Sequence, residues 1–186
     1  SHWARKRVAD DASPPLPQRA RRIVSMAPSV AETLFALGLG DRVVGVTRYC
    51  SFPPEALQKP RVGGYMDPNF EAIVALRPDL VVTLEGAEQN EAAFAKLRLP
   101  LLIVNHKSIE GILASIATIG RAGGVEDRAE RLLADLCARL ERVRAKVEGL
   151  ARPRVMLSVD RTPGTGHSED AYISGSDGHV GRVYVH

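Results

Sequence analysis

Short hydrophobic runs alternate along this chain with segments in which hydrophobic residues recur every three or four positions. The runs are too short for helices and are typical of buried parallel strands; they lie at residues 23–26, 43–46, 79–83 and 101–104. The intervening segments have the periodicity of helices with one buried face; they cover residues 29–37, 69–76, 90–97 and 108–122. Strand and helix in alternation predict an α/β fold with a parallel sheet, whose strand order the pattern leaves open.

The segment after the first run combines a helix start with a position suited to binding. Ser29 is followed three residues later by Glu32, the spacing of a capping box in which each side chain accepts from a free backbone N–H. We therefore expect Ser29 to cap the first helix and Gly38 to end it. Pro28 and Ser29 also lie where a strand ends and a helix begins, which is where open α/β sheets bind ligands.

The pattern changes after residue 125. Residues 126–150 form one predicted helix, roughly 37 Å long at about 1.5 Å per residue. Its hydrophobic stripe steps by three and four positions and consists of Leu133, Leu136, Leu140, Val143, Val147 and Leu150. We expect this stripe to pack along the α/β lobe, although pairing of two chains into a homodimer is an alternative.

A further strand is predicted at residues 154–159, and the residues after it are rich in Gly, Ser and Asp without helical periodicity. They are too few to build another α/β lobe. The predicted organisation is therefore a disordered, proline-rich arm, an α/β lobe, a connecting helix and an incomplete second lobe. These parts cover residues 1–20, 21–124, 125–150 and 151–186.

Composition narrows the function classes. The net charge of +3 comes largely from basic residues near the start of the chain, and no basic stripe typical of nucleic-acid binding follows. No hydrophobic run approaches the roughly 20 residues of a membrane helix. Cys50 and Cys137 stand in unlike contexts, so a disulfide is possible but not favoured, and no cysteine cluster suggests zinc. Common enzyme signatures such as GxSxG, HExxH and a P-loop are absent, so we expect neither an enzyme nor a resident cofactor.

Several motifs occur together in an order typical of one family. They are APS at 27–29, VGVTRYC at 44–50 with two prolines at 53–54, VGGY at 62–65, PN at 68–69 and ALRPDLVV at 75–82. With the long helix, they make residues 21–160 resemble the amino-terminal lobe of ABC-transporter solute-binding proteins of the helical-backbone type. That group includes periplasmic receptors for cobalamin, siderophores and haem, and the resemblance is strongest to the cobalamin-binding branch.

The resemblance implies two α/β lobes joined by one rigid helix, with the ligand held between the lobes and delivered to an ABC permease in the membrane. It also implies a periplasmic or lipid-anchored location. Residues 126–150 match the joining helix in place and length. The family's second lobe continues well past a strand like that at residues 154–159, so we expect a truncated second lobe here.

The loops at the carboxyl ends of the predicted strands carry the candidate ligand-binding residues. These are Pro28, Ser29, Arg48, Tyr49, Gly64, Tyr65, Met66, Glu85, Gly86, Asn105 and His106. A corrinoid is a large, partly apolar macrocycle fringed with amides, so it needs aromatic faces and scattered hydrogen-bonding groups. Tyr49 and Tyr65 are candidates for the aromatic faces. Ser29, Arg48 and Asn105 are candidates for the polar contacts.

Three of these residues have alternative roles. Tyr65 is as well suited to packing within its loop, while the resemblance to haem-binding receptors adds iron ligation, because a tyrosine near this position ligates iron there. His106 can bind a metal, but a lone loop histidine is more often hydrogen-bonded or on the surface. Arg48 pairs either with an acidic group of the ligand or with Glu55 or Asp67.

Glu71 falls in the first turn of the helix predicted at residues 69–76. A carboxylate in that position complements the helix dipole whatever else it does. The resemblance adds a second role, because a glutamate at this motif position in the cobalamin-binding branch docks on arginines of the membrane permease.

Three functions are therefore open. The favoured one is capture of cobalamin or a related metal chelate for an ABC importer. The second is a haem or ferric-siderophore receptor of the same family. The third, from another class, is a small α/β protein that binds phosphate or a nucleotide at the helix start marked by Ser29.

Overall fold

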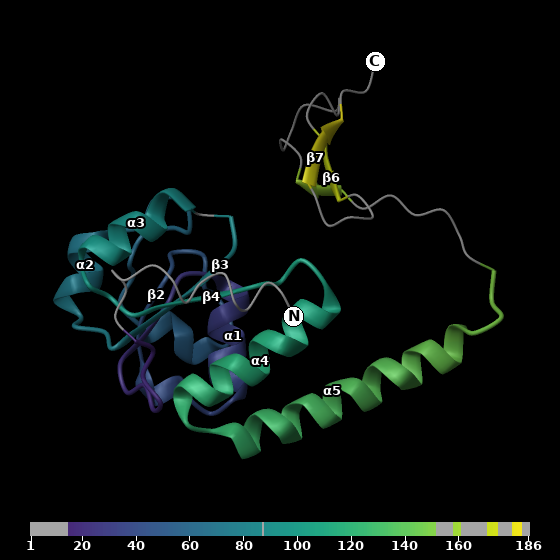
Figure 1. Ribbon diagram of the computed structural model, residues 1–186. Coiled ribbons are helices and arrows are strands. Elements are labelled where there is room, and N and C mark those ends of the chain that lie inside the picture. Colours follow the sequence, from purple (N-terminus) through teal and green to yellow (C-terminus); the bar gives the residue numbers. More distant parts are fainter. Residues whose placement is uncertain (1–14, 87, 152–157, 161–170, 175–179, 184–186) are drawn as a thin grey trace. The chain divides into compact units, whose positions relative to one another are not determined.

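The computed structural model describes residues 15–86, 88–151, 158–160, 171–174 and 180–183. The chain divides into two compact units, Ser1–Ala138 and Arg139–His186. The first unit contains the sheet and the helices packed on it (Figure 1). Each unit is described by itself below.

The first unit is built on a parallel sheet with the order β2-β1-β3-β4. Its strands are β1 (Ile23–Ser25), β2 (Val43–Val46), β3 (Leu80–Leu84) and β4 (Leu101–Val104). Since all the pairings are parallel, the strand ends followed by loops and helices meet at one edge, which we call the carboxyl edge. The predicted α/β fold is confirmed. The chain leaves β1 and β3 toward opposite sides, so this edge contains a topological switch point, a usual place for a ligand.

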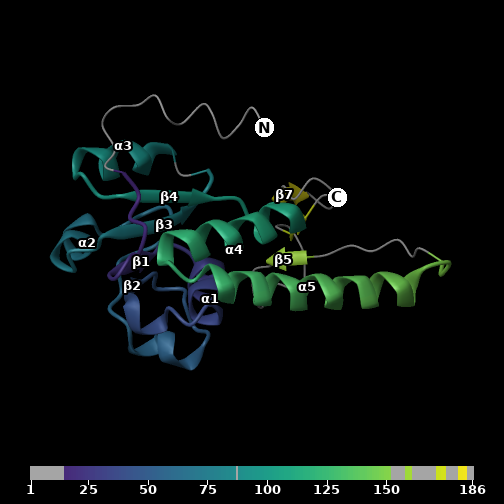
Figure 2. The same cartoon turned by 60° about the horizontal axis from the view of Figure 1, so that its bottom comes forward.

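Helices cover both faces of this sheet (Figure 2). They are α1 (Pro28–Ala36), α2 (Phe70–Ala75), α3 (Glu88–Lys96) and α4 (Ile109–Gly123), with short 3-10 turns at Gly40–Arg42 and Pro54–Gln58. On one face, Leu34 of α1 and Ile119 of α4 are buried against Leu80. On the other face, Ile73 of α2 and Phe94 of α3 are buried against Val81. The alternating sides of β3 therefore fill two separate cores, as expected for a strand with both faces covered.

The predicted capping role of Ser29 is wrong. The helix begins one residue earlier, because Pro28 occupies its first turn and Ala27, with φ −151° and ψ 150°, is the residue that precedes it. Proline suits this place since its φ is preset and its missing N–H would have no partner there. Ala27 makes no side-chain cap, and Ser29, one position inside the helix, directs its hydroxyl elsewhere, as described below.

Helical spacing within residues 69–76 predicts that Phe70, Ile73, Val74 and Leu76 face the core, and this prediction is wrong at Val74. Ile73 is fully buried, whereas Val74 is 44% exposed. The helix is only six residues long, so it presents a narrow stripe to the core and Val74 falls outside it. At the other end of the first unit, Ala20, which was predicted to be the last residue of the arm, is buried and donates its N–H to the carbonyl of Ala122 at 2.8 Å.

The long helix α5 spans Glu126–Val147, three residues shorter than predicted. In the first unit, Ala129 is buried and Leu132, Leu133 and Leu136 pack against the core, so packing along the lobe is confirmed for this part. In the second unit, the stripe is 38–63% exposed from Leu140 to Leu150. Pairing of two chains through that part stays a prediction.

The second unit contains an antiparallel sheet with the order β5-β6-β7. Its strands are β5 (Ser158–Asp160), β6 (Ala171–Ser174) and β7 (Val180–Val183). The predicted strand at 154–159 overlaps β5, while residues 154–157 lie outside the described residues. β6 and β7 were not predicted, because four-residue strands with mixed polarity give little periodic signal.

Two further expectations concern a disulfide between Cys50 and Cys137 and a membrane-spanning helix. Cys50 is buried with its Sγ 3.2 Å from Thr47 Oγ1, and Cys137 is exposed; both are free thiols. Within the described segments, no helix is long and apolar enough to cross a membrane.

Candidate functional site

The candidate residues gather at the carboxyl edge of the parallel sheet. The loops after β1, β2, β3 and β4 end there, and the segment around Gly63 joins them. A parallel bridge links Val46 to Arg61, and Arg48 donates its N–H to the carbonyl of Gly63 at 2.9 Å. The edge therefore consists of five loop segments, and backbone bonds join the segment around Gly63 to β2 and the loop after it.

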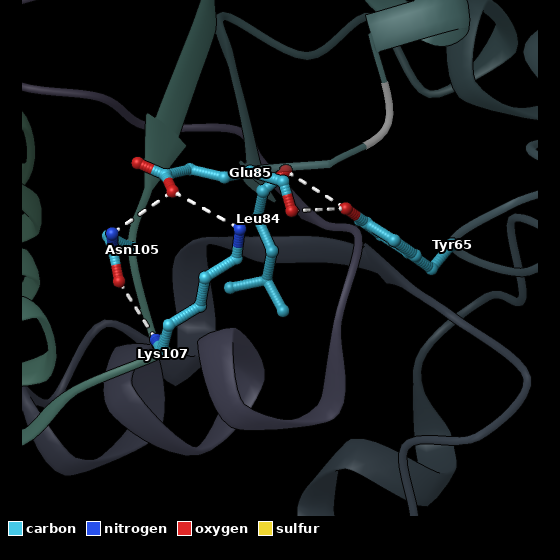
Figure 3. A network of polar contacts seen from close by, with 5 residues as sticks. All are labelled: Tyr65, Leu84, Glu85, Asn105 and Lys107. Atoms are coloured by element: carbon cyan, nitrogen blue, oxygen red, sulfur yellow. Dashed lines mark hydrogen bonds and ion pairs between the residues drawn. The ribbon is translucent and has the colours of Figure 1, made fainter. Parts of the chain in front are cut away.

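Tyr65 is anchored to the end of β3 (Figure 3). Its half-buried hydroxyl is 2.7 Å from the carbonyl oxygen of Glu85 and 3.2 Å from that of Leu84. Its own carbonyl accepts from Nδ2 of Asn90, a buried residue of α3, at 3.1 Å. Gly86 adopts φ +102°, and a Cβ there would lie 3.4 Å from the Tyr65 hydroxyl. Tyr65 is thus held at both its backbone and its hydroxyl.

Glu85, Asn105 and Lys107 form a polar cluster next to Tyr65 (Figure 3). Asn105 Nδ2 donates to Glu85 Oε2 at 3.0 Å, and its Oδ1 accepts from the N–H of Lys107 at 2.8 Å. Lys107 Nζ lies 3.9 Å from the same oxygen, Oε2 of Glu85, and the Glu85 side chain is 18% exposed. A Cβ at Gly111 would come within 2.7 Å of Asn105 Oδ1, so the start of α4 has room for Asn105 only because residue 111 is glycine.

His106 joins the first turn of α1 to the interior of α4. Its Nδ1 lies 2.9 Å from Ser29 Oγ, and its Nε2 lies 2.9 Å from Oγ of the buried Ser115. Burial of the ring lowers the pKa of His106 below its ordinary value. Both ring nitrogens already have partners, and the described residues contain no group of three or more His, Cys, Asp or Glu side chains placed to hold a metal ion.

The loop after β2 differs from these clusters in its exposure. Tyr49 is 63% exposed and Met66 is 59% exposed. Arg48 pairs with Asp67, one of the two carboxylates anticipated for it, and its guanidinium carbon lies 5.4 Å from the centroid of the Tyr49 ring. Gly64 is buried beside this ion pair, and a side chain there would collide with Asp67.

The predicted site residues thus fall into two groups at the carboxyl edge. We call the first the bonded group: Ser29, Tyr65, Glu85, Asn105 and His106. We call the second the open group: Arg48, Tyr49, Met66 and Gly86. Pro28 is half-buried in the first turn of α1, and Gly64 provides space for the Arg48–Asp67 pair.

Sequence reasoning missed three residues that hold the bonded group together. Asn90 and Ser115 are polar residues on otherwise hydrophobic helix faces, and such a mismatch is the signal that could have found them. Lys107 follows the candidate pair Asn105 and His106 directly, but its position beside Glu85 depends on β3 and β4 being neighbours, which the sequence pattern does not give.

Glu71 lies apart from both groups, on α2. It is exposed in the first turn of that helix, whose start is capped by Asn69, with Oδ1 accepting from the N–H of Ala72 at 3.0 Å. The carboxylate is therefore in the place where it complements the helix dipole and is accessible to a partner.

Comparison with known proteins gives a consistent set of relatives. A family model described as periplasmic binding protein matches residues 23–183. The chain is similar to an uncharacterised ABC transporter substrate-binding lipoprotein, YvrC, of Bacillus subtilis, with 34% identity over 165 residues, or 84% of this chain and 50% of that protein. It is also similar to the vitamin B12-binding protein of Pectobacterium carotovorum, with 30% identity over 80% of this chain and 54% of that protein. The chain spans about half the length of these curated relatives.

Solved structures show the same fold. The periplasmic vitamin B12-binding protein BtuF of Vibrio cholerae matches with a TM-score of 0.72 and 27% identity, over 77% of this chain and 57% of that one. The periplasmic haem-binding protein RhuT of Roseiflexus sp. RS-1, in its apo form, matches with a TM-score of 0.73 and 29% identity, over 85% and 60%. Because one is described as binding vitamin B12 and the other haem, the likeness supports the fold without selecting a ligand.

Proposed function

The chain belongs to the periplasmic binding protein family, and on that premise we propose that it captures cobalamin or a related metal chelate for an ABC importer. The family consists of substrate-binding proteins, so the expectation of a binding module rather than an enzyme is confirmed. The proposal concerns the ligand, the surface that holds it and the partner that receives it.

The open group is the observation that carries this proposal. Tyr49 and Met66 leave most of their surface in water at an edge where α/β sheets bind ligands. An apolar macrocycle gains by covering such side chains. The neighbouring Arg48–Asp67 pair and the half-buried Glu85 and Asn105 offer polar groups that suit amides at a corrinoid's rim.

A haem receptor is the second candidate, because RhuT, a structural relative of comparable similarity, is described as haem-binding. Iron ligation by Tyr65 would require its hydroxyl to leave the carbonyl oxygens of Leu84 and Glu85. Breaking those bonds costs free energy, so this arrangement favours a chelate whose metal needs no tyrosine ligand. The phosphate-site alternative loses its basis, since Ser29 does not cap α1 and its hydroxyl faces His106.

The test of ligand capture is titration calorimetry of the 186-residue chain with cyanocobalamin, with haemin followed in parallel by its Soret absorbance. Saturable binding of cyanocobalamin is the expected result. Haemin binding with a Soret shift that Tyr65→Phe abolishes would replace cobalamin by haem. Absence of binding to both would refute the claim that this chain captures either ligand by itself.

We also propose an ABC permease as the partner, with Glu71 as one docking contact, and a periplasmic or lipid-anchored location like that implied for the lipoprotein relative. Glu110 is a matched control, because each glutamate is the exposed second residue of a helix whose N-cap side chain accepts from the N–H of the third residue. Replacing Glu71 by Gln should weaken binding to the permease in nanodiscs by about tenfold, the effect of about 1.4 kcal/mol. The Glu110→Gln variant should bind like the unsubstituted chain, and equal binding by both variants would remove Glu71 from the interface.

A further inference from the structure

His106 connects three segments that are far apart in the sequence. It follows β4, and its ring lies between Ser29 in the first turn of α1 and Ser115 in the second turn of α4. Ser115 is buried, so the contact to Nε2 is shielded from water. The imidazole therefore links the helices that begin at the carboxyl edge after β1 and β4.

The partners of the ring determine its tautomer. The hydroxyl of Ser115 donates its single proton to the carbonyl of Ile112 at 2.7 Å, so its oxygen can only accept from His106. Nε2 must then carry a hydrogen, and in a neutral ring Nδ1 is unprotonated and accepts. Ser29 completes the chain by donating its hydroxyl proton to Nδ1.

We propose that His106 is a positioning residue of the carboxyl edge: as the neutral Nε2–H tautomer it holds the first turn of α1 to α4, and its protonation loosens this link and weakens ligand binding. The role in binding rests on the proposed function, whereas the tautomer and the link do not. In an imidazolium, both ring nitrogens donate. Ser29 would have to turn its hydroxyl away and accept instead.

The surroundings disfavour the imidazolium. Burial lowers the pKa of His106, and a cation there would also lie beside the positive end of the α1 dipole. The charged groups on the elements around the ring are Glu32 of α1, Glu85 after β3, Lys107 in its own loop, and Glu110 and Arg121 of α4. Among the described residues, none of these forms an ion pair with the imidazole; Glu85 is engaged by Asn105 and Lys107 instead.

The direction of the pH effect follows from this lowered pKa. As pH falls below about 6.5, the ordinary histidine value, the unfolded chain binds a proton at this residue more readily than the folded chain does. The free energy of unfolding therefore decreases with acidification. Ligand affinity should begin to fall at a lower pH, below the lowered pKa of His106, and by up to about tenfold per pH unit, because only protein with a neutral His106 is competent to bind.

The first test needs no ligand. Long-range 1H–15N NMR of the 186-residue chain at pH 8 should show His106 as the Nε2–H tautomer. On titration to pH 5, the amides of Ser29 and Ser115 should shift with the ring at one midpoint below 6.5. An Nδ1–H tautomer, or a ring that titrates while both amides stay still, would overturn the proposed link.

The second test measures the affinity for cyanocobalamin between pH 8 and pH 5 in the unsubstituted chain and in His106→Gln. A glutamine amide can donate to Ser115 but offers Ser29 no ring nitrogen, and it does not titrate. We therefore expect an affinity several-fold lower at pH 8 and a flatter pH profile. The other four histidines of the chain are present in both proteins, so the difference between the profiles isolates His106. Parallel profiles would refute the positioning role. If cyanocobalamin does not bind, the proposed ligand fails, while the NMR result still decides the tautomer and the link.

Discussion

The bonded group and the open group share one edge of the sheet but differ in what their side chains contact. In the bonded group, Tyr65, Asn105 and His106 each make two or more hydrogen bonds within the chain. In the open group, Tyr49 and Met66 are largely exposed. One part of the edge is therefore rigid and already satisfied, and the other is available.

This difference indicates that the two groups contribute to binding in different ways. Moving a satisfied polar group costs its hydrogen bonds, whereas covering an exposed aromatic ring releases water at no such cost. A surface whose polar part is fixed in advance also loses less conformational entropy when a ligand arrives. We therefore expect changes in the bonded group to act on stability and to reach affinity through the positions of the loops, and changes in the open group to act on affinity directly.

Replacing Tyr49 by Ala should produce the largest effect, a ten- to hundredfold loss of affinity for cyanocobalamin, about 1.4–2.7 kcal/mol. The free energy of unfolding should change by less than about 0.5 kcal/mol, because the ring is mostly exposed. Calorimetry and urea unfolding measure the two quantities. Leu57, which is also exposed but lies in the 3-10 turn Pro54–Gln58, is the control: Leu57→Ala should leave affinity unchanged. An equal loss of affinity in Tyr49→Ala and Leu57→Ala would show that the open group binds the ligand no more specifically than any other exposed hydrophobic residue.

Replacing Asn105 by Ala should destabilise the chain by about 1–2 kcal/mol, since Glu85 loses its amide donor and the N–H of Lys107 loses its acceptor. Urea unfolding monitored by circular dichroism measures this change. The exposed amide of Gln58 provides the comparison, and Gln58→Ala should stay within about 0.5 kcal/mol. An Asn105→Ala variant as stable as Gln58→Ala would mean that the cluster around Glu85 contributes nothing to rigidity.

The smallest effect should come from Lys107→Ala, below about 0.5 kcal/mol in unfolding free energy. Its ammonium is 3.9 Å from Glu85 Oε2 and its side chain is 55% exposed, and such surface ion pairs are weak and screened by salt. Repeating the urea titration at low and at high salt checks this. A loss comparable to that of Asn105→Ala would show that charge, and not the amide, holds Glu85 in place.

The fold was largely predictable because its signals are local. The strands 43–46 and 101–104 have the predicted bounds, since short buried runs between helices leave few alternatives. The start of α1 was not predictable, because Ser29 and Glu32 have capping-box spacing whether or not the helix begins at the preceding Pro28. Val74 was misplaced because periodicity alone does not tell how short a helix is.

The site was predictable in its location but not in its contacts. Parallel strands place their following loops at one edge, so Tyr49, Tyr65, Glu85 and Asn105 could be assigned to it from the sequence. The bonds between them depend on the strand order β2-β1-β3-β4, which brings the residues after β3 and β4 together. No short-range pattern encodes that neighbourhood, and for this reason Lys107 was missed as a partner of Glu85.

The central claim is that the ligand lies on the carboxyl edge and covers the open group. The most direct measurement is 1H–15N NMR of the chain as cyanocobalamin is added. The account predicts shifts at Tyr49, Met66 and Gly86 and none at Arg77 and Arg98, which lie in the turns before β3 and β4 at the opposite edge of the sheet. Shifts at Arg77 and Arg98, with Tyr49 and Met66 unchanged, would contradict it.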